Sequence, residues 1–506
     1  MAFESNNFNV AKKYKLPKSE FTVECNISAD GEISKIFTVS SDVSIETKEV
    51  LASSVSYTGL IETCLVYLTE SGEVGSVHTS CPFTSRFEDS NINSDQKAVI
   101  RTQIVGYSIG AINGLNVSIN YTLSQEGFVV SNEEVRSVTT TDDYFAVKQE
   151  EMKVVHFIGD CSTNFTAQLP LITREPIKKL LLCESQASIK DVTPGLNFIS
   201  VTGEVVSRLL YLTESDRFES AYVFDSFKQE VELDGVTRES QAEACAFVKY
   251  SEVKAVVNNE EKGAKIEICV PVELCVMAYD EVEVNVVADL YSTKNEVEVE
   301  TQSFDMTRSL PIEIIEGKID GNLVIEDDMP RIDKILFSGG NSVNISNVQI
   351  NEGVVNIEGI AKTNVVYLND ESNSLNSVEV EVPFVLNGRV DFADDAEVYA
   401  LAVLSDVDVA VKRGRELFYD AKVKVIVYAD RNDVSAVISS ASLKEELPER
   451  DYAMEIVFGK QGQTAWDIAK MNKIKENMIV LQNPDVGFPL AENTEIVLFY
   501  QNTNKK

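Results

Sequence analysis

The chain has 506 residues, of which 81 are Asp or Glu and 45 are Lys or Arg, so its formal net charge is −36 at neutral pH. At about 150 residues per domain this length predicts roughly three or four domains, and a hydrophobic fraction of 44% predicts that they fold. The charge argues against nucleic acid or an anionic membrane surface as the general partner, because both require clustered Lys and Arg. A basic partner, a neutral polymer or a second copy of the chain stays open.

The N-terminal segment predicts no secretory signal, because its lysines are not followed by an apolar run of about seven residues. Nowhere do about 18 apolar residues run together, so we expect no membrane span. These patterns favour a cytoplasmic protein. In that reducing compartment the eight cysteines, which form no CxxC pair, are expected to be buried free thiols.

Most of the chain up to about residue 447 alternates apolar and polar residues. Examples are Val282, Val284 and Val286, and later the run from Val423 to Val427. This period of two places one face of a strand on a core and the other in water, which favours antiparallel sheets. We therefore predict a mainly β fold class, with β-sandwich-like domains and few helices.

An internal repeat divides this region into three. In each copy a Tyr follows a Gly by eight residues, and a Phe follows that Tyr by 16 or 17 residues. A Lys followed by an apolar residue precedes the Gly by 24 or 25 residues. The landmarks are Gly59, Tyr67 and Phe83 in the first copy, Gly203, Tyr211 and Phe227 in the second, and Gly359, Tyr367 and Phe384 in the third. The predicted domains are residues 1–150, 151–310 and 311–447.

The landmark residues favour structural roles. A Gly inside a strand indicates a bulge or the close approach of another part of the chain. A Tyr flanked by apolar residues, such as Tyr67 in Val66-Tyr67-Leu68, is expected to bury its ring and direct its hydroxyl to a backbone partner.

The pattern changes in residues 451–506, which predict a fourth domain. Met454 to Phe458 reads as a strand, Gly462 to Met471 as a helix, Ile474 to Gln482 as a second helix and Thr494 to Tyr500 as a closing strand. This β-α-α-β unit contains the only Trp of the chain, Trp466, and its formal net charge is −1. Nearly all of the acidity therefore lies in the three repeats.

The C-terminal unit resembles a LysM domain, whose pattern is a strand, a Gly-Asp-Thr-Leu-Trp-x-Ile-Ala helix start and an Asn-Pro after the second helix. The corresponding residues run from Gly459 to Lys470 and from Leu481 to Asp485. Thr464 is expected to cap the first helix, and Trp466 to lie on or near its inner side.

LysM domains bind N-acetylglucosamine polymers through the loop before the first helix and the loop after the second. Two departures, Gln463 for the family's Asp and Ala465 for its Leu, favour reuse of the fold for protein contact over glycan binding. The resemblance places a partner-binding site at Gly462, Gln463, Thr464, Trp466, Asn483, Pro484 and Asp485, with a core role for Trp466 in either case.

The three repeats resemble the SPOCS domain (DUF3794) of clostridial spore proteins, through the Lys-Ile start, the Val-x-Gly and Val-x-Tyr strands and the Pro-Phe strand. Three such copies before a LysM unit are similar to a family of spore-coat morphogenesis proteins. The resemblance implies a non-enzymatic adaptor in the mother cell, at the forespore surface. There its LysM unit contacts the coat-scaffold ATPase, stage IV sporulation protein A, and helps the coat encase the forespore.

Two other functions stay open: binding of peptidoglycan or another N-acetylglucosamine polymer, and self-association into filaments through exposed strand edges. An enzyme is not expected. Only His78 and His156 are present, and no HExxH, GxSxG or GxxxxGK[ST] pattern occurs. Acidic clusters lie in turn-like stretches and are interpreted as solvated surface, so no catalytic residue, metal site or cofactor is predicted.

Overall fold

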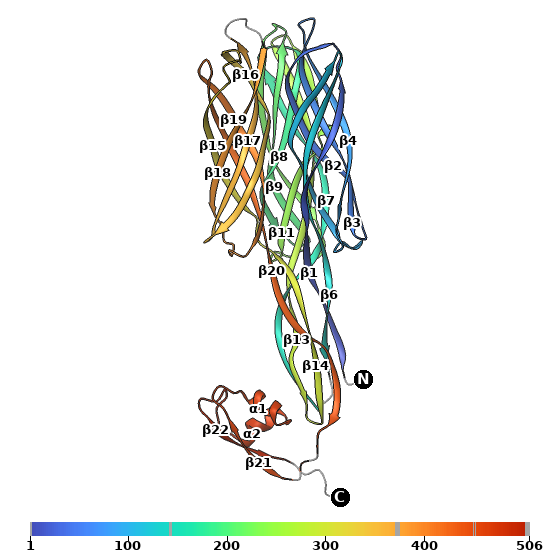
Figure 1. Ribbon diagram of the computed structural model, residues 1–506, viewed down its shortest axis with the longest axis vertical. Helices are drawn as coiled ribbons and strands as arrows, with labels where there is room; N and C mark the ends of the chain where they lie inside the picture. The colour runs from blue at the N-terminus through green and yellow to red at the C-terminus, as the bar shows by residue number, and fades with distance from the viewer. Residues whose placement is uncertain (1–2, 141–143, 370–374, 449, 451, 501–506) are drawn as a thin grey trace.

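The computed structural model describes residues 3–140, 144–369, 375–448, 450 and 452–500, and it is built mostly from β-strands (Figure 1). This confirms the prediction of a mainly β chain. Three successive segments, called repeats 1 to 3, each form two antiparallel sheets. A small unit that contains two helices follows them at the C-terminus.

The sheets of the repeats are assembled in the same way. In repeat 1, one sheet contains β1 (Glu4–Ser28), β5 (Lys97–Asn113) and β6 (Asn116–Thr139), and the other β2 (Ile33–Leu51), β3 (Ser54–Thr69) and β4 (Val74–Glu88). In repeat 2, one sheet contains β7 (Phe145–Thr173), β11 (Gln241–Val248), β12 (Lys254–Glu260) and β13 (Gly263–Ser292), and the other β8 (Ile177–Pro194), β9 (Phe198–Thr213) and β10 (Phe218–Glu232). A 3₁₀ turn, Tyr250–Glu252, links β11 to β12.

Repeat 2 divides the strand that corresponds to β5 into β11 and β12, whereas repeat 3 keeps that strand whole and divides its first strand. One sheet contains β14 (Asn295–Ser309), β15 (Glu313–Val324), β19 (Glu397–Arg413) and β20 (Glu416–Glu446), and the other β16 (Ile332–Asn351), β17 (Val354–Asn369) and β18 (Leu375–Arg389). Both β14 and β15 pair with β20, and Leu310-Pro311 lies between them. Proline has no N–H to donate to a sheet, which explains a break at this point.

The bulges of the three repeats coincide. The strand that opens the second sheet shifts register at three places in every copy, as after Ile33, Ile36 and Ile45 in β2. Strand β16 has one additional shift, between Gly339 and Ser342, which accounts for its longer Lys-to-Gly spacing. Repeat 2 therefore has the same local structure as repeats 1 and 3.

The landmark Gly and Phe are direct cross-strand partners. Gly59 pairs with Phe83, and the same pairing joins Gly203 to Phe227 and Gly359 to Phe384. A Cβ on Gly59 would lie 2.4 Å from the Phe83 ring and 2.4 Å from the Ser44 carbonyl oxygen. Only Gly leaves room for the aromatic ring to cross its own strand partner.

The landmark tyrosines are buried. The Tyr67 hydroxyl accepts a hydrogen bond from the Asp30 N–H at 3.1 Å, and the Tyr367 hydroxyl donates one to the Pro330 carbonyl at 3.1 Å. These bonds tie the end of β3 or β17 to the loop that precedes β2 or β16. They satisfy the one polar group of each ring.

The three repeats close into a ring. Strand β4 contacts β8 of the next repeat, β10 contacts β16, and β18 contacts β2. Apolar side chains from all three repeats meet in one buried cluster: Phe37, Cys64, Val66, Leu181, Leu182, Leu210, Phe337 and Val366. A single chain thus builds an assembly with approximate threefold symmetry.

A stalk extends from this ring (Figure 1). It consists of the paired ends of six strands, residues 4–12, 131–139, 145–155, 281–292, 295–308 and 431–446. Each of these strands contributes to its core, which contains Val10, Val135, Val154, Val286, Phe304, Met306 and Val437. The stalk therefore needs all three repeats to bury its apolar side chains.

Strand pairing bears on the expected domain boundaries. Strand β7 begins at Phe145 and runs through residues 150 and 151. Strand β14 ends at Ser309, before the expected boundary at residue 310. It pairs with β20 of repeat 3, however, so it belongs with that repeat. The division of the chain at 150 and 310 stays a prediction, as does the independence of each repeat as a domain.

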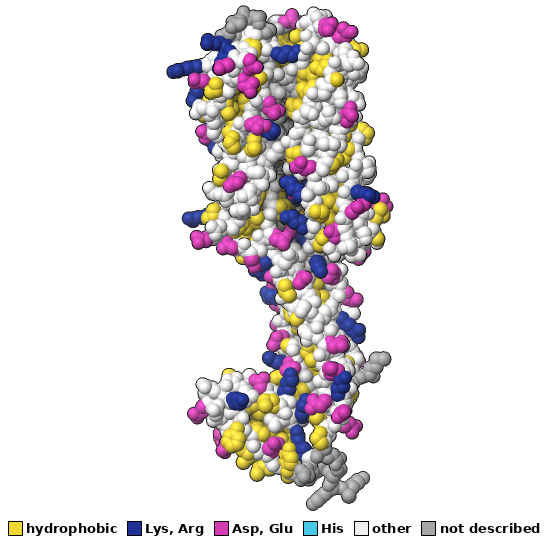
Figure 2. Space-filling model, viewed as in Figure 1, with side chains coloured by type: hydrophobic (Ala, Val, Ile, Leu, Met, Phe, Trp, Pro, Cys, Tyr) yellow, Lys and Arg dark blue, Asp and Glu magenta, His cyan; other side chains and the backbone are white. Residues whose placement is uncertain are grey.

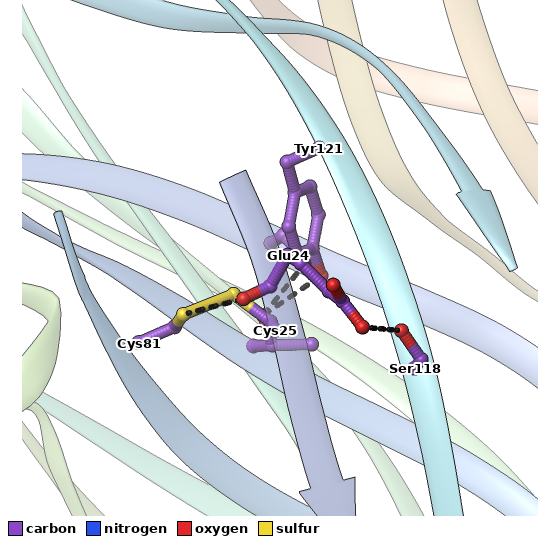
Figure 3. Close-up of a disulfide and its surroundings, with 7 residues drawn as sticks. Glu24, Cys25, Cys81, Ser118 and Tyr121 are labelled. Atoms are coloured by element: carbon purple, nitrogen blue, oxygen red, sulfur yellow. Dashed lines mark hydrogen bonds between the residues drawn. A yellow bond between two sulfur atoms is a disulfide. The ribbon is translucent and has the colours of Figure 1, made fainter. Parts of the chain in front are cut away.

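The expectation that all cysteines are free thiols is wrong for two of them. Cys25 of β1 and Cys81 of β4 form a disulfide that joins the two sheets of repeat 1 (Figure 3). The two residues are 56 positions apart, and alternation within a strand carries no information on which strand faces it. The other six cysteines are free.

Candidate functional site

The C-terminal unit has the predicted order of elements: β21 (Met454–Gly459), α1 (Ala465–Met471), α2 (Glu476–Gln482) and β22 (Thr494–Phe499). Strands β21 and β22 pair antiparallel. One face of this small sheet and both helices enclose a buried cluster that includes Trp466, Ile468, Ala469, Ile479, Leu490, Ile496 and Leu498.

A capping box starts α1. The Thr464 hydroxyl accepts a hydrogen bond from the Asp467 N–H, and the Asp467 carboxylate accepts one from the Thr464 N–H at 2.9 Å. These bonds satisfy two of the N–H groups that a helix start leaves unpaired. The Asp467 carboxylate also accepts a hydrogen bond from the Thr464 hydroxyl at 2.8 Å, and the two bonds that it accepts lower the pKa of Asp467 because they favour the charged form. The predicted cap at Thr464 is confirmed.

Several of the expected partner-binding residues make bonds within the unit. The buried Asn483 side chain donates to the Ile479 and Val497 carbonyls and accepts from the Val497 N–H, so it joins α2 to β22. The Gln463 side chain accepts a hydrogen bond from the Lys460 N–H at 2.8 Å. Gly462, Pro484 and Asp485 are exposed. Binding at these loops stays a prediction.

Trp466 faces the stalk. It is only 8% exposed, and its indole N–H donates to the Asp289 carboxylate of β13 at 2.8 Å. The same carboxylate accepts from Lys470 Nζ at 2.7 Å. Sequence reasoning missed Asp289, because the two partners are 177 positions apart and no motif surrounds it.

The opposite side of the small sheet is apolar and exposed. Met454, Ile456 and Phe458 alternate along β21, and Phe499 of β22 pairs with Met454. Their exposed fractions are 53%, 49%, 74% and 52% in that order. We call these four residues the outer sheet face. Hydrophobic side chains gather on the surface of this unit in Figure 2.

The four side chains of the outer sheet face are neighbours on one surface, unlike single apolar residues scattered over a protein surface. Contiguous apolar patches on otherwise soluble surfaces mark sites for other molecules. The sequence shows the alternation of apolar residues along β21 that produces this face. Only the fold decides which side of the strand the helices cover. The outer sheet face is therefore the candidate docking site.

The repeats contain cavities of about 50 to 400 Å³. One of about 120 Å³ lies where residues of β2, β8 and β16 meet, and it is lined by Asp42, Glu184 and Asn341 among others. No group of three or more His, Cys, Asp or Glu side chains placed to hold a metal ion occurs among the described residues. Within the same residues, the helices are all too short or too polar to span a membrane.

A protein-family profile described as SipL, SPOCS domain, matches residues 32–112 and 331–412. These ranges begin just before β2 and β16 and end near the close of β5 and β19. They lie in repeats 1 and 3, and repeat 2 shares their sheet order and bulges. No curated protein and no solved structure matches the chain. The chain is therefore similar to the SPOCS domain of SipL over parts of repeats 1 and 3, and this similarity indicates a sporulation-related protein.

Proposed function

We propose that this chain is a non-enzymatic adaptor of spore-coat assembly, which docks on a coat scaffold of the stage IV sporulation protein A type through its C-terminal unit. The observation that carries the proposal is the exposed outer sheet face, at the end of the molecule farthest from the ring (Figure 1). The SPOCS matches in repeats 1 and 3 supply the sporulation context.

The physical basis is burial of apolar surface. Full burial of a large apolar side chain contributes about 1.5–3 kcal/mol, and a few such residues dominate most protein interfaces. Phe458, with 74% of its surface exposed, is the largest single contributor available on this face. The small net charge of the C-terminal unit reduces its electrostatic repulsion from an acidic partner. The strongly acidic repeats, in contrast, repel other acidic surfaces.

The proposed location follows from the partner. A chain that docks on a scaffold at the forespore surface of the mother cell would be recruited there without a lipid-binding segment of its own. Several contacts along one chain then raise the effective concentration of each module at the coat. Individually modest affinities can hold a layer together in this way.

The test substitutes Phe458→Glu or Ile456→Glu in the full chain and measures binding to the purified scaffold ATPase by biolayer interferometry. We expect at least a tenfold loss of affinity, because a charge replaces a buried apolar contact. The matched control is Val385→Glu, an exposed apolar residue of β18 that is 59% exposed. Equal affinity of the Phe458→Glu chain and the unmodified chain would refute docking through this face.

A parallel titration with chitin oligomers separates docking from glycan binding. The exposed Gly462, Pro484 and Asp485 lie in the loops that the LysM resemblance assigns to glycan. Saturable binding that is unaffected by Phe458→Glu would favour the glycan function over the adaptor. We expect no saturable binding.

A further inference from the structure

The C-terminal unit is attached to the stalk by a group of polar contacts centred on Asp289. Its Oδ2 accepts the Trp466 indole N–H at 2.8 Å, and Lys470 Nζ lies 2.7 Å from Oδ1 and 2.9 Å from Oδ2. Trp466 and Lys470 are four residues apart in α1, so they project from one side of the helix. The Asp289 carboxylate thereby contacts α1 near its start, at Trp466, and near its end, at Lys470.

Tyr291, two residues further along β13, extends the contact. Its ring is buried against Trp466 in an edge-to-face arrangement, with 5.0 Å between ring centroids. Its hydroxyl donates to the Ile474 carbonyl at 2.7 Å, in the segment between the helices. Lys473 of the unit pairs with Glu296 of the stalk at 2.8 Å. The interface thus combines apolar, hydrogen-bonding and ionic contacts.

The stalk has a local feature that serves this contact. Strand β13 shifts register between Val287 and Asp289, and its partner strand β7 continues without interruption from Gln149 to Lys148. A bulge of this kind re-aims the side chains that follow it. Val287 and Leu290 are three positions apart but lie in the same buried cluster, which strict alternation does not allow, and Asp289 and Tyr291 then face the C-terminal unit.

We infer that Asp289 and Tyr291 form an intramolecular receptor for the Trp466 side of α1, which holds the outer sheet face away from the stalk. The helices cover the inner side of the β21–β22 sheet, and the stalk contacts the helices, so the outer sheet face points outward. The consequence for partner binding rests on the proposed function: a fixed orientation lowers the entropy cost of docking. Asp289 is a positioning residue for that docking.

The first test needs no partner, because Trp466 is the only Trp and its fluorescence reports the interface. In the full chain, Asp289→Ala and, from the other side, Lys470→Ala are expected to red-shift Trp466 emission and increase its quenching by acrylamide. Asp289→Asn retains an acceptor for the indole N–H and should give an intermediate result. Glu283→Ala, an exposed residue of the same strand, is the matched control and should change neither quantity.

The second measurement is affinity for the scaffold ATPase. We expect Asp289→Ala to weaken it several-fold through faster dissociation, less than Phe458→Glu does. Unchanged Trp466 fluorescence in Asp289→Ala and Lys470→Ala would overturn the intramolecular receptor, whatever the partner does. A changed fluorescence with unchanged affinity would overturn the positioning role. Normal binding by Phe458→Glu with altered fluorescence in Asp289→Ala would refute the proposed docking face and leave the receptor standing.

Discussion

The repeated Gly and Phe show how a single residue position can specify a sandwich. In each repeat the Phe ring lies across the neighbouring strand, over the Gly with which the Phe is paired, where no Cβ is present. The ring joins the core between the two sheets, so one glycine sets both the cross-strand pairing and the packing. The requirement is steric, which explains why the same pair recurs at the same spacing in three copies.

Replacement of Gly59 by Ala is predicted to destabilise the protein by about 1–3 kcal/mol, in the range of an overpacked core. The added methyl would lie 2.4 Å from the Phe83 ring and from the Ser44 carbonyl oxygen, and the backbone cannot move as a side chain can. The midpoint of chemical unfolding measures the effect. Gly106→Ala, in a strand position with open space around it, should leave the midpoint unchanged.

Asp42 gives a pH-dependent prediction. Burial and the nearby charge of Glu184 raise the pKa of Asp42 to about 7, although a side-chain hydrogen bond with Tyr250 opposes the shift. Below pH 3.8, the ordinary pKa of this group in the unfolded chain, the carboxyl is neutral in both the folded and the unfolded state, and its burial costs little. As the pH rises toward 7 the unfolded chain ionises first, so the folded state loses stability relative to it, and the loss is complete above about 7.

Asp42→Asn should therefore stabilise the protein by about 1–2 kcal/mol at pH 8 and by less at pH 5. The amide keeps an oxygen for the Tyr250 hydroxyl and removes the charge. Thermal unfolding of the full chain at the two pH values measures the difference. The exposed Asp225→Asn of β10 serves as control, and an equal gain at both pH values would contradict the assignment to Asp42.

Single elements are stabilised by contacts at their ends and by covalent links between them. The capping box makes the seven-residue α1 possible, because so short a helix is marginal without its cap and its packing. The disulfide has a comparable role between elements, since β1 and β4 belong to opposite sheets of repeat 1.

Thr464→Ala is expected to cost about 1 kcal/mol, the usual value of a lost N-cap. The loss should be confined to the C-terminal unit. Denaturation followed by Trp466 fluorescence would shift to lower denaturant, whereas the circular dichroism of the β-strands would not. Asn477→Ala, an exposed position in α2, should not lower either transition.

Removal of the Cys25–Cys81 link by a double substitution to Ala should cost about 2–4 kcal/mol, because the link closes a loop of 56 residues in the unfolded chain. Alkylation of the denatured protein should label six thiols without reductant and eight with it, as read by mass spectrometry. Eight labelled thiols without reductant would restore the interpretation that all are free. Cys161→Ala, a free thiol of β7, is the control.

At the scale of the whole molecule, one buried lysine joins all three repeats. Lys13 of β1 donates to Glu243 of β11 at 2.7 Å and to Asp430 of β20 at 2.8 Å, between the rings of Phe128 and Tyr279. Burial alone would lower the pKa of Lys13, but the charge of Glu243, the Tyr399 hydroxyl and the charge of Asp430 raise it above its usual value. The lysine is therefore charged where the ring meets the stalk.

Lys13→Met is predicted to destabilise the protein by about 3–5 kcal/mol, because it leaves two buried carboxylates without their partner. The effect should appear as a lower midpoint of global unfolding. Lys12→Met is the matched control, since the adjacent Lys12 pairs with Glu133 at the surface, where such pairs contribute little. If the two variants unfold alike, Lys13 does not hold the repeats together.

Local patterns in the sequence determined the number of repeats, their antiparallel strands, the β-α-α-β order at the C-terminus and the cap at Thr464. Alternation, spacing and capping act between residues that are neighbours in the chain, so a sequence displays them. The tertiary structure alone decided the closed ring, the shared stalk, the Cys25–Cys81 link and the contact of Trp466 with Asp289. Those contacts join residues from 56 to several hundred positions apart, and each depends on which sheet faces which.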